Sequence, residues 1–457
     1  MKTYLGIDVG SISTNFVLID EKANVLFSLY IRTEGDPIKA VKKGLKILRE
    51  KMPKGAEIKG VGATGSARQL VGVITGADLI KNEITAHAKG ASFFVPDVRT
   101  IIEIGGQDSK IIILENGVVV DFAMNTICMR GDTQITTNPS GIAKPIREIK
   151  IGQRVLTHKG RFMPVEQVYE RKHQGEMIRI EISNLKKIDV TPEHPILGVK
   201  ERGKNPSFIP AKDLRRGDFV VTFNNKKEFS LEPIKKIKRY RFNGKVYNLN
   251  VKDDHSYVAN FVGVGNCAAG TGSFLDNQAQ RLKIPIEKFG ELALKSKNPT
   301  TIASRCTVFA ESDMIHKQQI GHKIEDIVAG LCQGLARNFL NNVARGKNIK
   351  PPIVFQGGVS ENVGMRKAFE EELGEKIIVP KYNKVMGAFG VALLVKENPP
   401  KKTKFLGFGV ADKDIKCTSF QCNGCPNRCE VIEARIDGKV VARWGDRCGK
   451  WSALNPG

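Results

Sequence analysis

The spacing of apolar residues predicts a chain that begins as a mixture of strands and helices. Residues 3–31 contain three short apolar runs separated by turn-forming residues, which is typical of three strands. Residues 37–51 repeat apolar side chains three and four positions apart, which predicts a helix with Asp36 as its N-cap. A strand at 58–65, two helical stretches and a hairpin over 100–124 follow. Strands that alternate with helices indicate an α/β sheet.

The pattern changes at residue 128 and changes back after residue 266. Between these positions short β-type runs alternate with polar turns, and no long helical pattern occurs. Helical spacing then returns, with one long helix predicted over 310–345 and shorter ones over 363–373 and 385–396. An all-β domain is therefore predicted inside an α/β protein. We divide the chain into a first host segment 1–127, an insert 128–266, a second host segment 267–398, a linker at 399–404 and a tail 405–457.

Composition narrows the classes of function. No apolar run reaches the roughly 18 residues of a membrane span, and the first residues do not resemble a signal peptide. The net charge of +24 is compatible with nucleic-acid binding, but the insert carries about half of the excess and the rest is scattered over helix faces. We therefore expect a cytoplasmic protein without a nucleic-acid or membrane partner.

The two edges of the insert carry reactive side chains. The insert begins at Cys128 and ends at Asn266, and Cys267 follows immediately. A thiol can attack the carbonyl before it and convert the amide into a thioester, and a second thiol can then take over the acyl chain. An asparagine can cyclise onto its own carbonyl and release the chain. These three residues are the minimum set for protein splicing.

Five phrases inside the insert resemble the sequence blocks of inteins and occur in the same order: CMRGDTQI, IGQRVLTHKGRF, TPEH, FIPAKDLRRGDFV and KVYNLNV. The resemblance covers the whole insert and indicates a mini-intein, a Hint domain without a homing endonuclease. It implies that Thr191 and His194 strain and protonate the first scissile amide, and that His255 assists the cyclisation of the asparagine. The alternative is an ordinary β insert whose cysteine and histidines have no chemical role.

Two positions depart from the intein pattern. Gly265 stands where inteins usually carry histidine, and Asn248 stands where many carry aspartate. Because both positions tune the later steps, we expect slower splicing or a stronger dependence on His255.

Joining residue 127 to residue 267 gives a continuous host with three glycine turns after strands. Such turns can cradle phosphates with backbone N–H groups, and Asp8 would hold Mg²⁺ through water. A dinucleotide-binding fold is disfavoured because no GxGxxG opens a helix. The candidate nucleotide-binding residues are Asp8, Gly10, Ser11 and Ser13 in the first turn, Gly105, Gly106, Gln107 and Asp108 in the second, and Gly357 and Gly358 in the third.

The order of these turns resembles the actin/hexokinase/heat-shock chaperone superfamily, which implies a two-lobed ATPase. Within it, the phrases NEITAHAKG, IGGQDSK, MNTI joined to CAAGTGSFLD, CTVFAES and GGVSENVGMR resemble the ATP-dependent activators of 2-hydroxyacyl-CoA dehydratases and benzoyl-CoA reductases. The resemblance implies ATP and Mg²⁺ as ligands, and a 4Fe–4S cluster that Cys267 and Cys306 share across a homodimer. It also implies a ferredoxin or flavodoxin as electron donor and a dehydratase or reductase component as acceptor.

The remaining cysteines fall into two groups. Cys332 lies on the apolar face of a predicted helix and is expected in the core. Five of the nine cysteines crowd into the tail, which predicts a metal site. The preferred ligands are Cys422, Cys425, Cys429 and Cys448, with Cys417 as the fifth candidate. Cysteine ligands alone leave zinc and a second 4Fe–4S cluster open.

The sequence therefore predicts a precursor that excises its insert and yields an iron–sulfur ATPase coupling ATP hydrolysis to electron transfer. The sulfur of Cys267 would act first as splicing nucleophile and then as cluster ligand. The alternatives are a small-molecule kinase or a regulatory ATPase of the same fold, still interrupted by an intein.

Overall fold

The computed structural model describes residues 1–106, 108–124, 127–137, 143–182, 186–200, 205–223, 228–254, 256–265, 271–303 and 307–452. The chain forms two compact units. Unit 1 comprises Met1–Ile101, Ile112–Asp121 and Ile378–Gly457, and unit 2 comprises Ile102–Ile111 and Phe122–Ile377. Within the described ranges, no helix is long and apolar enough to cross a membrane.

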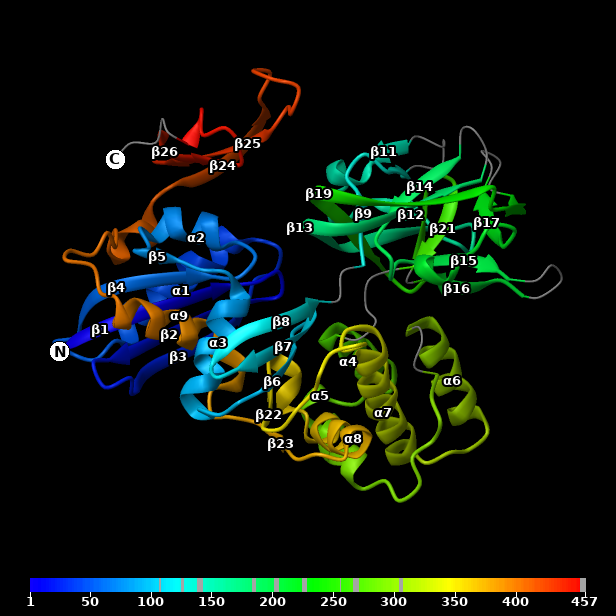
Figure 1. Ribbon diagram of the computed structural model, residues 1–457, viewed down its shortest axis with the longest axis horizontal. Helices are drawn as coiled ribbons and strands as arrows, with labels where there is room; N and C mark the ends of the chain where they lie inside the picture. Colours follow the sequence, from blue (N-terminus) through cyan, green and yellow to red (C-terminus); the bar gives the residue numbers. More distant parts are fainter. Residues whose placement is uncertain are drawn as a thin grey trace. The chain divides into compact units, whose positions relative to one another are not determined.

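Unit 1 is built on a five-stranded sheet with helices on both faces (Figure 1). On β1 (Lys2–Val9), Leu5 and Ile7 pack in one cluster with Leu45 of α1 (Pro37–Lys51), whereas Tyr4 packs on the other face with Phe389 of α9 (Met386–Glu397). Successive residues of a strand point to opposite faces, so β1 is apolar on both. In spatial order the strands are β3 (Val25–Arg32), β2 (Ser13–Asp20), β1 (Lys2–Val9), β4 (Glu57–Thr64) and β5 (Leu79–Ile80); the helices are α1 (Pro37–Lys51), α2 (Arg68–Thr75), α3 (Glu83–Phe94) and α9 (Met386–Glu397).

The N-cap predicted for the first helix is confirmed. The Asp36 carboxylate accepts a hydrogen bond from the Lys39 backbone N–H at 2.9 Å, which satisfies a donor at the start of α1.

The predicted linker is held against unit 1. The Thr403 hydroxyl donates to the Asp78 carboxylate at 2.7 Å, and the Lys404 N–H donates to the same carboxylate at 2.7 Å. Beyond it, η5 (Phe408–Asp412) packs against α1 and places Val410 in the core of unit 1. The tail then forms an antiparallel sheet of β24 (Ile415–Gln421), β25 (Glu430–Ile436) and β26 (Lys439–Trp444).

A second mixed region carries the other two glycine turns. Its sheet has the order β23 (Ile377–Ile378), β22 (Ile353–Gln356), β6 (Thr100–Ile104), β7 (Ser109–Glu115) and β8 (Val118–Met124). Its helices are α4 (Gly272–Arg281), α5 (Ile286–Leu294), α6 (Thr307–Gln319), α7 (Ile324–Asn342) and α8 (Val363–Leu373), with a turn η3 (Gly358–Glu361) after β22.

The single helix predicted over 310–345 is wrong. The structure has two helices, α6 and α7, and the break contains Gly321, whose φ of 83° lies in the left-handed region. Glycine adopts this conformation without the steric cost that a side chain would bring.

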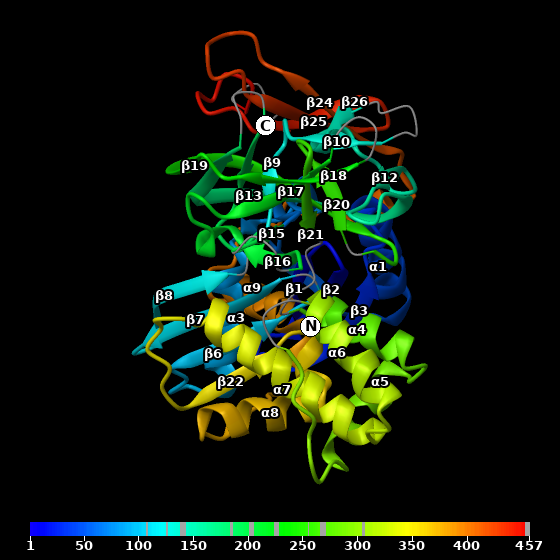
Figure 2. The ribbon, with the colours of Figure 1, turned by 90° about the vertical axis from the view of Figure 1, so that its right-hand side faces the viewer.

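Between residues 129 and 265 the described residues form strands and short 3₁₀ turns, with no α-helix among them (Figures 1 and 2). Two sheets share a core of buried aliphatic side chains. The first contains β11 (Ala143–Pro145), β10 (Gln134–Thr136), β20 (Ser256–Ala259), β21 (Val262–Gly265), β15 (Pro195–Val199), β16 (Ser207–Pro210), β17 (Phe219–Phe223) and β18 (Phe229–Pro233). The second contains β12 (Arg154–Leu156), β13 (Phe162–Glu181), β14 (Lys187–Val190), β9 (Met129–Arg130) and β19 (Lys236–Val251). The predicted combination of an α/β protein with an all-β segment is thus confirmed.

Candidate functional site

The register of three strands brings distant residues of the insert together at Cys128. Strand β9 pairs with both β14 and β19, so that Met129 lies opposite Val190 on one side and opposite Tyr247 on the other. Because both pairings are antiparallel, the residue before Met129 faces the residues after its two partners. Cys128 therefore lies beside Thr191 and Asn248.

Thr191 holds both polar groups of the Cys128 backbone. Its hydroxyl oxygen accepts from the Cys128 N–H at 2.9 Å and donates to the Cys128 carbonyl at 3.1 Å. Its own N–H donates to that carbonyl at 2.9 Å. Cys128 is 1% exposed and Thr191 is fully buried, so these bonds form away from water. Thr191 thus holds the nitrogen of the Ile127–Cys128 peptide bond, the bond that the sequence predicts to be cleaved first.

His194 lies in the same turn with its imidazole completely buried. Its backbone N–H donates to the Thr191 carbonyl at 3.0 Å, and neither ring nitrogen has a hydrogen-bond partner among the described residues. Burial lowers the pKa of His194 to about 3, an effect that the nearby Cys128 backbone opposes. The ring is therefore a neutral imidazole in the turn whose Thr191 binds Cys128.

Asn248 makes a contact that sequence reasoning missed. Its Nδ2 donates to the carbonyl oxygen of Ile127 at 2.8 Å, and this carbonyl belongs to the peptide bond that precedes Cys128. Its Oδ1 accepts from the Leu249 N–H at 2.7 Å and from the Tyr257 hydroxyl. The only signal in the sequence was the departure from aspartate at this position.

The other end of the insert reaches the same turn. Gly265 ends β21, which pairs with β15, and a β-carbon at Gly265 would lie 2.9 Å from the Pro195 ring and 3.4 Å from the Phe208 ring. Residues next to both ends of the insert thus contact the segment 191–195. A larger side chain at Gly265 would therefore require Pro195 to shift. Asn266, Cys267 and His255 lie outside the described residues.

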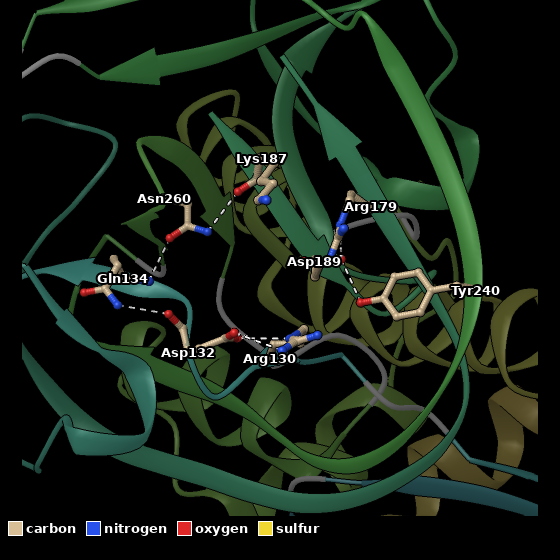
Figure 3. A network of polar contacts seen from close by, with 8 residues as sticks. All are labelled: Arg130, Asp132, Gln134, Arg179, Lys187, Asp189, Tyr240 and Asn260. Atoms are coloured by element: carbon tan, nitrogen blue, oxygen red, sulfur yellow. Dashed lines mark hydrogen bonds and ion pairs between the residues drawn. The ribbon is translucent and has the colours of Figure 1, made fainter. Parts of the chain in front are cut away.

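A polar network braces the strands that carry this site (Figure 3). Arg130 is the last residue of β9, and its guanidinium donates two hydrogen bonds of 3.0 and 2.9 Å to the Asp132 carboxylate. On β14 the Asp189 carboxylate accepts from Arg179 at 2.9 Å and from the Tyr240 hydroxyl at 2.7 Å. Burial, reinforced by Asp189, raises the pKa of Tyr240 to about 12. These bonds tie β13, β14 and β19 together beside Cys128.

The first candidate phosphate turn lies in unit 1. Gly10 N–H donates to the Ser13 carbonyl at 2.9 Å and closes the turn between β1 and β2, with Ser11 exposed at its tip. The Asp8 carboxylate is largely buried, and a β-carbon on Gly65 or Gly387 would meet it at 2.5 or 2.3 Å. Both glycines therefore leave room for this carboxylate.

The second and third candidate turns meet within unit 2. Gly105 N–H donates to the Asp108 carbonyl at 2.9 Å, and the Asp108 carboxylate lies 3.0 Å from the Lys110 ammonium. Gly357 has a φ of 89°, and a β-carbon there would lie 2.4 Å from the Ile104 carbonyl. Gly358 begins η3 directly after it. The structure thus brings Gly105, Gly106 and Asp108 next to Gly357 and Gly358, while Gln107 is outside the described residues.

The host cysteines divide into those that the structure describes and those that it does not. Cys332 is 1% exposed, and burial raises the pKa of its thiol to about 12, so its prediction as a core residue is confirmed. Cys267 and Cys306, the predicted cluster ligands, lie outside the described residues.

The tail cysteines are not gathered into one site. Cys422 Sγ accepts from the Gly424 N–H at 3.4 Å, and Cys422 N–H donates to the Cys429 carbonyl at 2.7 Å. In the described part of the chain, however, no three His, Cys, Asp or Glu side chains are close enough to hold a metal ion. As placed, Cys422, Cys425, Cys429 and Cys448 do not form a metal site. The predicted metal site on these residues stays a prediction.

Comparison with solved structures relates the chain to two kinds of protein. It shares its fold with the activator of the 2-hydroxyisocaproyl-CoA dehydratase from Clostridium difficile, solved with bound ADPNP, with a TM-score of 0.52 and 23% identity over 87% of this chain and 95% of that one. A gp41-1 intein aligns with 31% of this chain and 100% of its own length, with 24% identity and a TM-score of 0.25.

Sequence comparison gives relatives of the host. The 2-hydroxyisocaproyl-CoA dehydratase activator of Clostridioides difficile is 35% identical over 152 residues, which are 33% of this chain and 57% of that protein. The chain spans about half the length of the curated relatives it matches. The sequence profile of the BadF/BadG/BcrA/BcrD ATPase family matches residues 5–138 and 245–395, well over half of the chain, and passes over the middle of the insert. The chain therefore belongs to the BadF/BadG/BcrA/BcrD ATPase family.

Proposed function

We propose that the chain is a splicing precursor of an ATPase that activates a 2-hydroxyacyl-CoA dehydratase or a benzoyl-CoA reductase-like partner. The observation that carries the splicing half is the convergence of the two ends of the insert on residues 191–195. Cys128 is bound by Thr191, and Gly265 packs against Pro195. An inserted domain that excises itself must bring its two junctions together, because the acyl group passes from one to the other.

The described residues supply the elements of the first step. Cys128 provides the thiol, and Thr191 fixes the amide that the thiol converts into a thioester. The neutral imidazole of His194 belongs to the same turn as Thr191 and is a candidate to pass a proton to the departing nitrogen. Cys267 would then accept the acyl chain, and Asn266, assisted by His255, would release the insert.

The ATPase half is supported by family membership and by the turns of the host. Asp8, with Gly10, Ser11 and Ser13, would bind Mg²⁺ and phosphate oxygens in unit 1. Gly105, Gly106, Gln107, Asp108, Gly357 and Gly358 are the corresponding candidates in unit 2. After splicing we expect a homodimer that takes an electron from a ferredoxin or flavodoxin. A 4Fe–4S cluster on Cys267 and Cys306 would supply the low-potential electron.

Intact-protein mass spectrometry tests the splicing half. Expression of the 457-residue chain is expected to give the excised segment 128–266 and a ligated host that lacks it. Cys128→Ala should block thioester formation at the first junction, and Asn266→Ala should block release at the second. Recovery of full-length chain alone from the unsubstituted protein, under reducing and non-reducing conditions, contradicts the proposal.

The host is tested separately on the ligated product. Asp8→Asn is expected to abolish ATP hydrolysis. After anaerobic reconstitution, iron binding with absorbance at about 410 nm that bleaches on reduction would support the cluster. Cys306→Ala should lose this signal, whereas Cys332→Ala should keep it because Cys332 is a core residue. A colourless host that phosphorylates a small molecule would favour a kinase instead.

A further inference from the structure

The side-chain amide of Asn248 lies on the peptide group that the first splicing step breaks. Its Nδ2 is 2.8 Å from the carbonyl oxygen of Ile127, the acyl group that Cys128 would attack. We propose that Asn248 is a catalytic residue of this step and stabilises the negative charge that develops on that oxygen. The proposal rests on the splicing function proposed above. It assigns a role in the first step to the position where this chain departs from the usual aspartate, which the sequence had linked only to the later steps.

The orientation of the Asn248 amide follows from its other partners. The Oδ1 atom accepts from the Leu249 backbone N–H at 2.7 Å and from the Tyr257 hydroxyl. A backbone N–H is only a donor, so a flipped amide would place two donors against each other at Leu249. The NH₂ group must therefore face Ile127. Asn248 and Tyr257 are both fully buried, and the donor is aimed at the carbonyl before any reaction begins.

The chemistry of the first step requires such a donor. The Cys128 sulfur forms a bond to the Ile127 carbonyl carbon, and the carbonyl electron pair moves onto oxygen. That oxygen then returns its electron pair, the bond to the Cys128 nitrogen breaks, and the proton lost by the thiol ends on this nitrogen. The products are a thioester and an amine, with no change of oxidation state. Charge on the Ile127 oxygen is greatest midway, where a donor in a site without water is most effective.

An aspartate at position 248 would act differently. An ionised carboxylate accepts hydrogen bonds but cannot donate them, and it would repel the developing charge on the Ile127 oxygen. An asparagine donates at every pH at which the protein is folded. At position 248, an aspartate carboxylate could accept the thiol proton. The asparagine of this chain would instead activate the Ile127 carbonyl by donating a hydrogen bond to it.

The test isolates the first step in the full-length chain. Asn266→Ala with Cys267→Ala gives a parent in which neither transfer to the second thiol nor release can occur. Dithiothreitol then cleaves any thioester formed between Ile127 and Cys128, and mass spectrometry follows the appearance of residues 1–127. In this parent, Asn248→Ala is expected to slow the cleavage about 100-fold, the typical effect of losing one such donor. Tyr257→Phe should slow it by about tenfold or less, because Leu249 still orients the amide.

A pH profile separates a catalytic donor from a structural amide. Asn248→Asp should be slow at neutral pH, and its rate relative to the parent should rise as the pH falls. The reason is that a protonated carboxylic acid donates a hydrogen bond to the Ile127 oxygen and a carboxylate does not. A side chain that only supports the fold gives a ratio that does not rise toward acid. Hydrogen exchange of β14 and β19 shows whether each variant is folded.

The outcomes distinguish this proposal from the splicing proposal. If the parent cleaves and Asn248→Ala cleaves equally fast, the role of Asn248 is refuted and splicing stands. If the parent releases no more of residues 1–127 than its Cys128→Ala variant, both proposals fail. If Asn248→Ala loses exchange protection, the Asn248→Asp profile decides: a rise toward acid supports the donor role and a flat ratio overturns it.

Discussion

His194 should make the stability of the insert depend on pH in a direction that can be worked out. Its imidazole is completely buried and has a pKa of about 3, whereas an exposed histidine in the unfolded chain has a pKa of about 6.5. Below pH 6.5 the unfolded chain therefore binds a proton that the folded chain excludes. Stability rises with pH wherever the unfolded state binds more protons, so the folded insert loses stability as the pH falls from about 6.5 towards 3.

The size of the effect follows from the two pKa values. Each pH unit below 6.5 costs about 1.4 kcal/mol until the folded-state pKa is reached, which gives about 2 kcal/mol between pH 7.5 and pH 5. His194→Gln replaces the imidazole by a side chain that does not titrate. The difference in stability between pH 7.5 and pH 5 should therefore be about 2 kcal/mol smaller in this variant.

Hydrogen exchange of the parent Asn266→Ala/Cys267→Ala measures this difference locally. The backbone amides of Thr191 and His194 are hydrogen-bonded, and a peptide covering 186–200 reports their opening. The exchange rates are corrected for the intrinsic rate at each pH. Between pH 7.5 and pH 5, the protection factor of this peptide should then fall about 30-fold more in the parent than in His194→Gln. A parallel loss of protection in both proteins would refute the reasoning, since it would show that another group controls the acid sensitivity.

Three further substitutions test the hydrogen bonds and ion pairs of the structure. Thr191→Val removes two hydrogen bonds to Cys128, together about 1–3 kcal/mol, and should slow dithiothreitol cleavage about 10- to 100-fold, while Thr191→Ser stays near the parent rate. Asp254→Asn weakens a fully buried carboxylate bound to Arg161 and should lower the exchange free energy of the insert by about 1–3 kcal/mol. Lys110→Met removes the ammonium that lies 2.7 Å from the buried Glu103 carboxylate and should destabilise the host by about 3–5 kcal/mol in thermal unfolding. Adding Glu103→Gln should restore part of this stability, and an equal loss in the double variant would contradict the pairing of the two charges.

The sequence predicted those features that depend on local pattern and on motif spacing. The α/β host, the all-β insert and the N-cap at Asp36 follow from periodicity and from single residues. The break between α6 and α7 was missed because apolar spacing continues across Gly321, and only the backbone conformation reveals the turn. The docking of Thr403 on Asp78 was missed for a related reason. A polar linker and a polar segment that caps a distant carboxylate look alike in sequence.

In the candidate splicing site, too, some residues could be predicted from sequence motifs and one contact could not. Cys128, Thr191 and His194 could be singled out because they occur in recognisable phrases. The contact of Asn248 with Ile127 could not, since it depends on the register of β9 against β19, two strands more than a hundred residues apart. Register is set by the buried pattern of the whole sheet, so one strand read alone does not reveal it.

The segment that follows the insert is already bound to the host before any peptide bond is exchanged. The Gly272 and Ser273 N–H groups donate to the Gly105 and Gly106 carbonyls, each at 2.9 Å, although the insert separates these residues in the chain. The two flanks are thus held together by the host itself, in addition to the covalent connection through the insert, and the acyl exchange proposed above would take place between tethered ends. If the backbone were cut within the insert, we expect these host contacts to keep the two pieces associated, so the splicing proposed above could be tested on two separate fragments without an added affinity tag.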